Sequence, residues 1–196
     1  MKSKQKTTNT LRIIAGQWRN RKLGFPDAPG LRPTTDRVRE TVFNWLQAHI
    51  AGSNCLDLFA GSGAMGIEAL SRDAQKVDFV EKAPLVKKQL DANLAILQAN
   101  KGSTFQIDAQ QFVSTCKQQY DVIFIDPPYG ERLLEEILQL ILEHNVLKPD
   151  GYLFIEDDNK LSPLIAQTTL TDALILRKEK KAGNVYYGLA QYRLNE

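Results

Sequence analysis

The sequence predicts an α/β, Rossmann-like fold in which a seven-stranded, mostly parallel sheet carries helices on both faces. Two observations support this prediction. From residue 54 onward, short apolar segments alternate with helical segments, and a glycine-rich turn follows the first apolar segment. Near the C-terminus, two strand-like segments flank Ala182-Gly183-Asn184, so the sheet should end in an antiparallel hairpin.

The first fifty residues follow a different pattern. Residues 1–10 are basic and polar, and we expect a disordered tail there. Residues 11–50 should form a hairpin and then a helix, with Thr34-Thr35-Asp36 as the N-cap of that helix. The predicted organisation is therefore a tail, a small N-terminal hairpin and helix extension, and one larger domain over residues 51–196.

The larger domain is predicted to alternate between strands and helices. The expected strands are 54–59, 76–81, 103–107, 121–126, 151–156, 173–179 and 184–192. The expected helices are 64–72, 84–99, 109–117, 131–144 and 161–167. In such a sheet the first and fourth strands meet at the switch point, where ligands bind outside the carboxyl ends of the strands.

The charge is unevenly distributed along the chain. Residues 1–40 contain ten Lys or Arg and three Asp or Glu, although the net charge of the whole chain is only +2. A basic front on a mildly acidic body is typical of a protein that binds a polyanion with one end.

Other features of the composition exclude several classes of protein. Cys55 and Cys116 lack metal-ligand spacing and no histidine cluster accompanies them, so we expect no metal site. The N-terminal segment lacks the apolar stretch of a signal peptide, and no apolar run approaches the length of a membrane span. We therefore predict a cytoplasmic protein with no membrane partner.

The glycine-rich turn indicates a bound cofactor. Gly61, Gly63 and Gly66 have the spacing G-x-G-x-x-G between a strand and a helix, and Glu81 ends the next strand. This fingerprint alone is also compatible with a nicotinamide-dependent oxidoreductase, or with a tight turn that holds no ligand. Asp57, four residues before Gly61, would repel a pyrophosphate, but it suits the ammonium and sulfonium groups of S-adenosylmethionine.

The expected contacts with S-adenosylmethionine follow from these positions. Glu81 is placed to accept hydrogen bonds from the ribose hydroxyls, and glycines let the backbone approach the cofactor closely. Asp108, after the third strand, should accept from the adenine amino group, cap the helix that follows, or do both. The predicted cofactor-binding residues are Asp57, Phe59, Gly61, Gly63, Glu81 and Asp108.

The segment Asp126-Pro127-Pro128-Tyr129 follows the fourth strand and predicts chemistry on an amino group. The lone pair of an exocyclic amino group on a nucleobase is delocalised into the ring, so acceptors for both N–H groups favour attack on a methyl sulfonium. The Asp126 carboxylate and the Pro127 carbonyl can accept them, held by a proline-fixed backbone. Tyr129 offers a face for stacking the base. The alternative is a strand that simply ends in a proline-rich turn.

Four segments, taken in order, resemble a known family: LRIIAGQWRNRKL, LRPTTDRVRETVFNWL, CLDLFAGSGAMGIEAL and VIFIDPPYG. They are similar to the RsmD family of class I S-adenosylmethionine-dependent methyltransferases, from about residue 11 to the C-terminus. The resemblance implies the class I methyltransferase fold and methylation of the N2 amino group of a guanine in 16S ribosomal RNA, at the position numbered 966 in that RNA. It also implies that Asp126 and Tyr129 are catalytic and that Glu81 binds the cofactor.

An RNA substrate gives the basic front a role, because cationic side chains there can neutralise phosphates around an extruded guanine. The predicted RNA-binding residues are Arg12, Arg19, Arg21, Lys22, Arg32 and Arg37. Arg39 either joins them or pairs with Glu40 or Glu68, and Trp18 either stacks on a base or packs in the hairpin. The acidic segment 156–158 and the charged hairpin 176–184 are interpreted as solvated, with a minor chance that the hairpin touches RNA.

Other assignments stay open from the sequence alone. A DNA or RNA methyltransferase acting on adenine N6 or cytosine N4 uses the same chemistry. A nicotinamide-dependent oxidoreductase leaves Asp57 and Asp126 unexplained. The expected partner is 16S ribosomal RNA, within a partly or fully assembled small subunit, and we expect a monomer.

Overall fold

The computed structural model describes residues 9–28, 34–128, 133–167 and 173–193. One seven-stranded sheet organises the molecule, in the order β5-β4-β3-β6-β7-β9-β8. Its strands are β3 (Asn54–Asp57), β4 (Lys76–Val80), β5 (Gly102–Phe105), β6 (Tyr120–Ile125), β7 (Leu147–Asp157), β8 (Leu174–Ala182) and β9 (Val185–Tyr192). The pairings among β3 to β7 are parallel, and β9 pairs antiparallel with both β7 and β8, which confirms the predicted fold.

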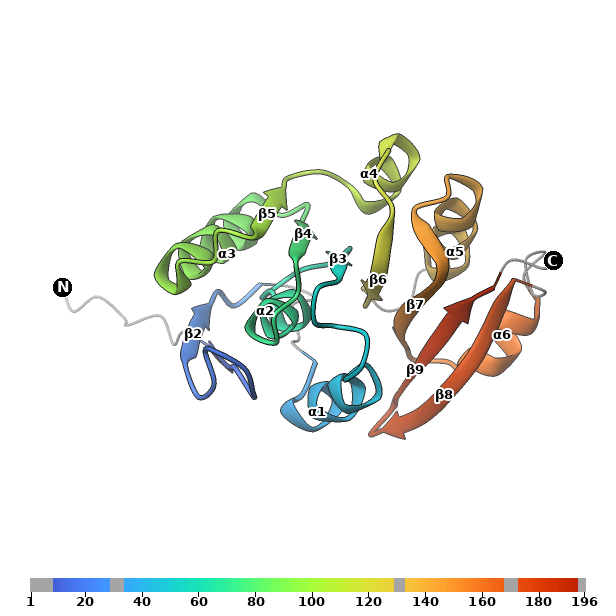
Figure 1. Cartoon of the computed structure of the whole chain (residues 1–196), viewed down its shortest axis with the longest axis horizontal. Helices are drawn as coiled ribbons and strands as arrows, with labels where there is room; N and C mark the ends of the chain where they lie inside the picture. The colour runs from blue at the N-terminus through green and yellow to red at the C-terminus, as the bar shows by residue number, and fades with distance from the viewer. Residues whose placement is uncertain (1–8, 29–33, 129–132, 168–172, 194–196) are drawn as a thin grey trace.

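Helices cover both faces of this sheet (Figure 1). One face carries α1 (Asp36–Trp45), α2 (Ala64–Ser71) and α3 (Pro84–Leu97), and the other carries α4 (Ala109–Thr115), α5 (Leu133–Glu143) and α6 (Leu161–Gln167). Successive strand residues point to opposite faces, so Cys55 packs with the first set of helices and Leu56 with the second. This explains why the central strand β6 is apolar at nearly every position.

The strand β7 is longer than the sequence predicts. It begins at Leu147, four residues before the expected start, because Leu147 pairs with Tyr120 of β6 ahead of a register shift. The Pro-Asp-Gly segment after Leu147, which has the composition of a turn, lies within the strand. In the part of the chain that is described, no helix is both long and apolar enough to cross a membrane.

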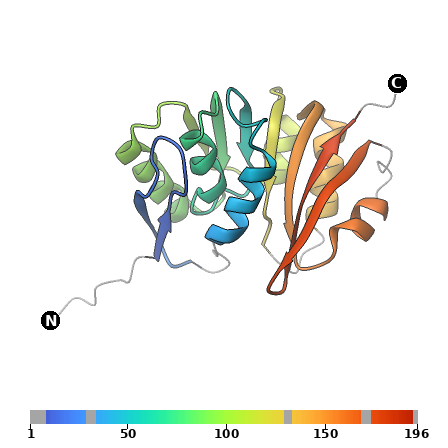
Figure 2. The ribbon, with the colours of Figure 1, turned by 60° about the horizontal axis from the view of Figure 1, so that its bottom comes forward.

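The N-terminal extension contains a second, two-stranded sheet. Its strands β1 (Asn9–Arg12) and β2 (Lys22–Phe25) pair antiparallel, and their turn lies at the opposite end of the hairpin from the N-terminus (Figure 2). The first two residues of β1 fall inside the segment expected to be disordered, and they are ordered by pairing with β2. Trp18 packs against the core, which agrees with the packing interpretation rather than base stacking. The division into an extension and a catalytic domain stays a prediction.

A buried carboxylate attaches the extension to the body. Glu68 of α2 is completely buried, and its two oxygens accept hydrogen bonds from the backbone N–H groups of Ile14 (2.8 Å) and Ala15 (3.0 Å). Arg72 donates to the same carboxylate at 2.8 Å, and an Arg39 nitrogen lies 3.6 Å away. Glu68 therefore satisfies buried groups on two separate segments.

Arg39 completes this buried cluster. Its side chain is 1% exposed, and it donates to the carbonyl oxygen of Arg12 and to Asp36, both at 2.6 Å. The predicted pairing with Glu68 is confirmed, and Glu40 takes no part in it. Arg39 is thus a structural residue whose charge is not available to RNA.

We predict that Glu68→Ala lowers the free energy of unfolding by about 3–5 kcal/mol, because it removes the buried carboxylate that pairs with Arg72 and Arg39 and leaves two backbone donors without an acceptor. Urea unfolding followed by circular dichroism measures this loss. The matched control is Glu40→Ala on the exposed face of α1, which should change stability by no more than about 0.5 kcal/mol. Equal, small effects of the two substitutions would show that Glu68 does not anchor the extension.

Candidate active site

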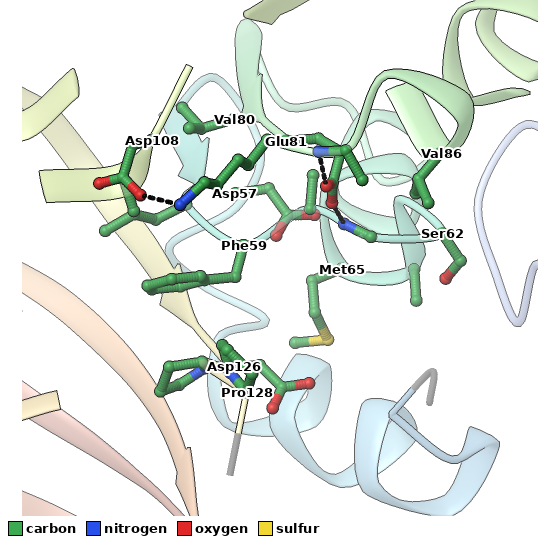
Figure 3. Close-up of a pocket in the computed structure, with 18 of the residues that line it drawn as sticks. Asp57, Phe59, Ser62, Met65, Val80, Glu81, Val86, Asp108, Asp126 and Pro128 are labelled. Atoms are coloured by element: carbon green, nitrogen blue, oxygen red, sulfur yellow. Dashed lines mark hydrogen bonds and ion pairs between the residues drawn. The ribbon is translucent and has the colours of Figure 1, made fainter. Parts of the chain in front are cut away.

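A cavity of about 430 Å³ opens at the carboxyl ends of the parallel strands β3, β4 and β6 (Figure 3). Its size lies within the range typical of sites for small organic ligands, about 300–1,000 Å³. The predicted residues that line it are Asp57, Phe59, Gly61, Glu81, Asp108, Asp126 and Pro127. Residues far apart in the sequence therefore meet at one edge of the sheet. Arg32 and Tyr129 lie outside the described residues.

The glycine turn connects β3 to α2 and has the strained backbone that glycine permits. Gly61 and Gly63 have positive φ angles of 50° and 79°. Glu81 holds this turn, because one of its carboxylate oxygens accepts from the N–H of Gly61 at 2.9 Å and the other from Ala83 at 2.6 Å. Each oxygen keeps a second lone pair, with which Glu81 can still accept from a ligand.

Gly63 differs from the prediction. It does not line the cavity, and a β-carbon there would lie 2.5 Å from Leu90 Cδ1 and 2.9 Å from Ile67 Cδ1. Gly66 is similar, since a β-carbon would lie 2.2 Å from the ring of Phe79. Helix packing on the sheet therefore accounts for these two glycines, and contact of Gly63 with the cofactor stays a prediction.

Asp57 ends β3 inside the cavity and is only 4% exposed. It accepts a hydrogen bond from the N–H of Gly66 at 2.8 Å. Burial, with a smaller contribution from the nearby charge of Glu81, raises the pKa of Asp57 from an ordinary value of 3.8 to about 7, although the hydrogen bond from Gly66 opposes the shift. A cation bound beside these two carboxylates would offset this cost, which fits a ligand with an ammonium or sulfonium group.

Asp108 lies where the sequence places it, just after β5. Its side chain accepts from the N–H of Gln110 at 3.0 Å and so caps α4, as one of its two predicted roles requires. It also pairs with Lys82 at 3.1 Å. The second role, accepting from the adenine amino group, stays a prediction.

Apolar side chains form the wall between the carboxylates. In Figure 3, Met65 and Phe59 lie between Asp57 on one side and Asp126 with Pro128 on the other. A wall of this kind excludes water and gives a purine an apolar surface against which to pack. Met65 is missing from the predicted set, because a methionine at the start of a helix has no sequence signal that separates a wall residue from a core residue.

Asp126 follows the last residue of β6 and is half-buried at the edge of the cavity. Burial raises the pKa of its carboxyl group well above the usual range, and the charge of Glu156 raises it further, while a hydrogen bond from Thr34 opposes the shift. The Thr34 hydroxyl lies 3.3 Å from Asp126 Oδ2. The charge of Asp57 raises the pKa of Asp126 by a smaller amount.

Sequence reasoning missed Thr34 and misplaced Glu156. Thr35 is the N-cap of α1, and Thr34, one residue earlier, is turned to Asp126 instead. The interpretation of Glu156 as solvated is wrong, because its side chain is 7% exposed. The reason is that β9 inserts beside β7, so Glu156 lies on an interior strand, opposite Tyr187. Neither placement has a local sequence signal.

The predicted RNA-binding side chains are not gathered around the cavity. Backbone groups of the β1–β2 turn bond to Ser71, the last residue of α2, and Arg21 donates to the carbonyl of Ile96 near the end of α3 at 3.1 Å. Both helix ends lie at the edge of the sheet opposite the cavity, as does the turn that carries Arg19 (Figure 2). Their contact with RNA stays a prediction, at a site away from the target base.

The other predicted cations differ in availability. Arg12 donates twice to Asp36 Oδ2, at 3.0 and 2.8 Å, so its charge is largely neutralised. Lys22 and Arg37 are exposed and form no ion pair with an acid in the described segments. Within those same segments, no cluster of three or more metal-ligating side chains occurs.

The sheet order and the cavity together define the class of protein. A parallel sheet closed by an inserted antiparallel strand, with acidic side chains ending β3, β4 and β6 in one cavity, is a class I S-adenosylmethionine-dependent methyltransferase. The chain belongs to the family described as Conserved hypothetical protein 95, whose model matches residues 11–191. The resemblance to the RsmD family is thereby confirmed.

Two curated relatives match nearly the whole chain, and both are called Ribosomal RNA small subunit methyltransferase D. The Escherichia coli (strain K12) protein is 44% identical over 92% of this chain and 89% of its own length. The Haemophilus influenzae protein is 45% identical over 92% of this chain and 93% of its own length.

Solved structures agree with the fold. A putative methyltransferase of Escherichia coli has a TM-score of 0.84 and 39% identity, over 94% of this chain and 99% of that one. A Thermus thermophilus 16S rRNA N2 G1207 methyltransferase has a TM-score of 0.72 at 19% identity, over 95% of this chain and 50% of that one, and shares the fold alone.

We predict that Asp57→Asn stabilises the ligand-free protein above neutral pH and weakens S-adenosylmethionine binding. The folded state holds the Asp57 proton more tightly than the unfolded state, so protonation of Asp57 stabilises the folded wild-type protein. This stabilisation is complete below pH 3.8 and is lost as pH rises through about 7. Thermal melts from pH 5 to pH 8.5, with and without S-adenosylmethionine, measure both effects. A melting temperature that depends on pH identically in the two proteins would contradict the assigned pKa.

Proposed function

We propose that this protein transfers a methyl group from S-adenosylmethionine to the exocyclic N2 amino group of a guanine in 16S ribosomal RNA, at position 966. One observation carries the proposal: Asp126, at the end of β6, lines the same cavity as the carboxylates of Asp57 and Glu81. An acceptor for an amino group therefore lies beside groups suited to a cationic cofactor. The names of the relatives at 44% and 45% identity support ribosomal RNA of the small subunit as the substrate.

The residues of this chain have separate tasks in the reaction. When bound, S-adenosylmethionine supplies a methyl group activated by a positively charged sulfur. Asp57 and Glu81 provide negative charge at one end of the cavity, and Phe59 and Met65 keep water out of its middle.

At the other end, Asp126 accepts an N–H hydrogen bond from the guanine amino group, and the carbonyl of Pro127 is the proposed second acceptor. This arrangement localises the nitrogen lone pair and orients it for attack. The proton lost from nitrogen passes to Asp126 or to solvent. Tyr129 lies outside the described residues, and its stacking role stays part of the proposal.

The partner and setting are also proposed. We infer that the substrate is the RNA within a partly or fully assembled small subunit, and that the protein is a cytoplasmic monomer. In the described part of the chain, both faces of the sheet are covered by helices, and the large apolar side chains that stay exposed are scattered: Leu85, Ile96 and Phe105. No extended apolar surface therefore calls for a second copy.

We predict that Asp126→Ala lowers kcat by about 10²–10⁴-fold, the usual contribution of a positioned proton acceptor, while S-adenosylmethionine affinity changes little. Methyl transfer to unmodified 16S RNA or small subunits, followed by nucleoside analysis, measures the rate and identifies the product. Asp158→Ala, an exposed aspartate after β7, is the control and should behave like the wild type. Label in N6-methyladenosine instead of N2-methylguanosine would overturn the proposed acceptor.

We predict that Glu156→Gln moves the acidic limb of the pH–rate profile to lower pH. Ionised Asp126 is the stronger acceptor for the amino N–H and can take up its proton, so activity falls as pH falls through the raised pKa of Asp126. Removing the Glu156 charge removes one cause of that raised pKa. Single-turnover rates between pH 5 and pH 9 measure the shift, with exposed Glu143→Gln as the matched control. A limb that moves to higher pH, or stays in place, would exclude this coupling.

A further inference from the structure

We propose that the end of the β8–β9 hairpin is a second RNA-contacting surface, which binds phosphates of the substrate beside the active-site cavity. We call it the lysine arm and define it by Lys178, Lys180 and Lys181. The inference rests on the proposed function, because it says where the RNA lies relative to the cavity. It assigns RNA contact to the C-terminal hairpin, whereas the charge pattern of the sequence favours the N-terminus.

The strand register places the lysine arm at the cavity edge. Ile125 of β6 is level with Ile155 of β7, so Asp126 is level with Glu156. Glu156 pairs with Tyr187 of β9, and Tyr187 pairs with Lys180 of β8. Three strand spacings, or about 14 Å, therefore separate Lys180 from the line of β6.

The hairpin also extends beyond the sheet at this edge. The last pair between β7 and β9 joins Asp157 to Tyr186, and Lys181 is level with them. The turn between Ala182 and Val185 projects past the end of β7, where no neighbouring strand covers it (Figure 2). A polyanion entering the cavity would pass along this projecting end.

The charges of the lysine arm are available. All three lysines are exposed, and none forms an ion pair with an acid of residues 9–28, 34–128, 133–167 or 173–193. Glu179, the acidic residue of β8, lies on the opposite face of the strand from Lys178 and Lys180 and on the same face as Lys181. There it accepts from the N–H groups of Leu161 (2.7 Å) and Ser162 (3.2 Å) at the start of α6.

Aromatic rings accompany two of the lysines. The Lys180 ammonium lies 5.6 Å from the ring centre of Trp45, which itself stacks on Tyr187 at 5.7 Å. The Lys181 ammonium lies 4.7 Å from the ring centre of Tyr186. Such contacts hold an ammonium group in place, and partly exposed rings offer faces for unpaired bases. Cations interleaved with aromatics are typical of surfaces that bind single-stranded RNA.

The N-terminal hairpin does not offer the same position. Its turn, with Arg19, is bound to Ser71 at the opposite edge of the sheet, and the guanidinium of Arg21 is bound to the end of α3. The lysine arm therefore supplies free positive charge at the edge where a base must enter. Phosphate contacts of this kind position RNA and carry little sequence information.

The test compares Lys180→Gln/Lys181→Gln with a matched control, Lys101→Gln/Lys117→Gln. The control lysines are also exposed, but they precede β5 and β6, so they lie at the edge of the sheet opposite the cavity. Binding of deproteinised, unmodified 16S RNA is measured from 50 to 300 mM salt, together with kcat and both KM values. The circular dichroism melt of each variant shows whether it is folded.

We expect the lysine-arm variant to bind RNA several-fold more weakly, with a slope of log K against log salt reduced by about one per lysine removed. The KM for RNA should rise, while the KM for S-adenosylmethionine and kcat at saturating RNA stay unchanged. The control variant should match the wild type. Charge reversal, Lys180→Glu/Lys181→Glu, should enlarge the effect.

Three outcomes overturn the inference. If the lysine-arm variant and the control variant lose RNA affinity equally, the loss comes from the change in net charge, and the position of the lysine arm does not matter. If the loss appears with assembled subunits but not with deproteinised RNA, the hairpin binds a ribosomal protein. If the wild type neither binds nor methylates RNA, the proposed function itself fails, and that result is distinct from the other two.

Discussion

The parallel pairing of β3 with β6 is the constraint on which the rest of the structure depends. Its register aligns Asp57 with Phe124, so the carboxylate that ends β3 and Asp126, two residues farther along β6, open into the same cavity. Apolar residues pack above and below both strands, which prevents a register slip that would turn either carboxylate into the core. The positions of the cofactor side and the acceptor side of the site are thus set by sheet packing, and loops only complete them.

Buried acidic groups have opposite consequences in two parts of the molecule. Glu68 and Arg39 lie 3.6 Å apart as an ion pair, and each also bonds to the backbone of the extension, so these buried charges attach the extension to the body. Asp57 and Asp126 lie in the cavity with raised pKa values, because burial opposes their ionisation and so do neighbouring carboxylates, Glu81 beside Asp57 and Glu156 beside Asp126. A cationic cofactor relieves that repulsion, so the site is least stable when empty and is complementary to the ligand that its class of enzyme binds.

Much of this arrangement could be predicted from the sequence, and the exceptions have a common cause. Alternating strands and helices, the glycine turn and the residues Asp57, Glu81 and Asp126 carry local signals. The roles of Thr34 and Glu156 do not, because each depends on a pairing between distant segments. Charge counting likewise located the cations of the N-terminus along the chain, but only the docking of its hairpin on α2 and α3 shows that Arg19 and Arg21 lie away from the cavity.

The most direct test of the account is a crystal structure of the protein with S-adenosylhomocysteine and guanosine. We predict that the thioether ligand lies against Asp57 and Glu81, and that the guanine N2 atom lies about 2.6–3.2 Å from a carboxylate oxygen of Asp126. A guanine bound with N2 turned away from Asp126, or an S-adenosylhomocysteine molecule outside the cavity at the ends of β3 and β6, would contradict it.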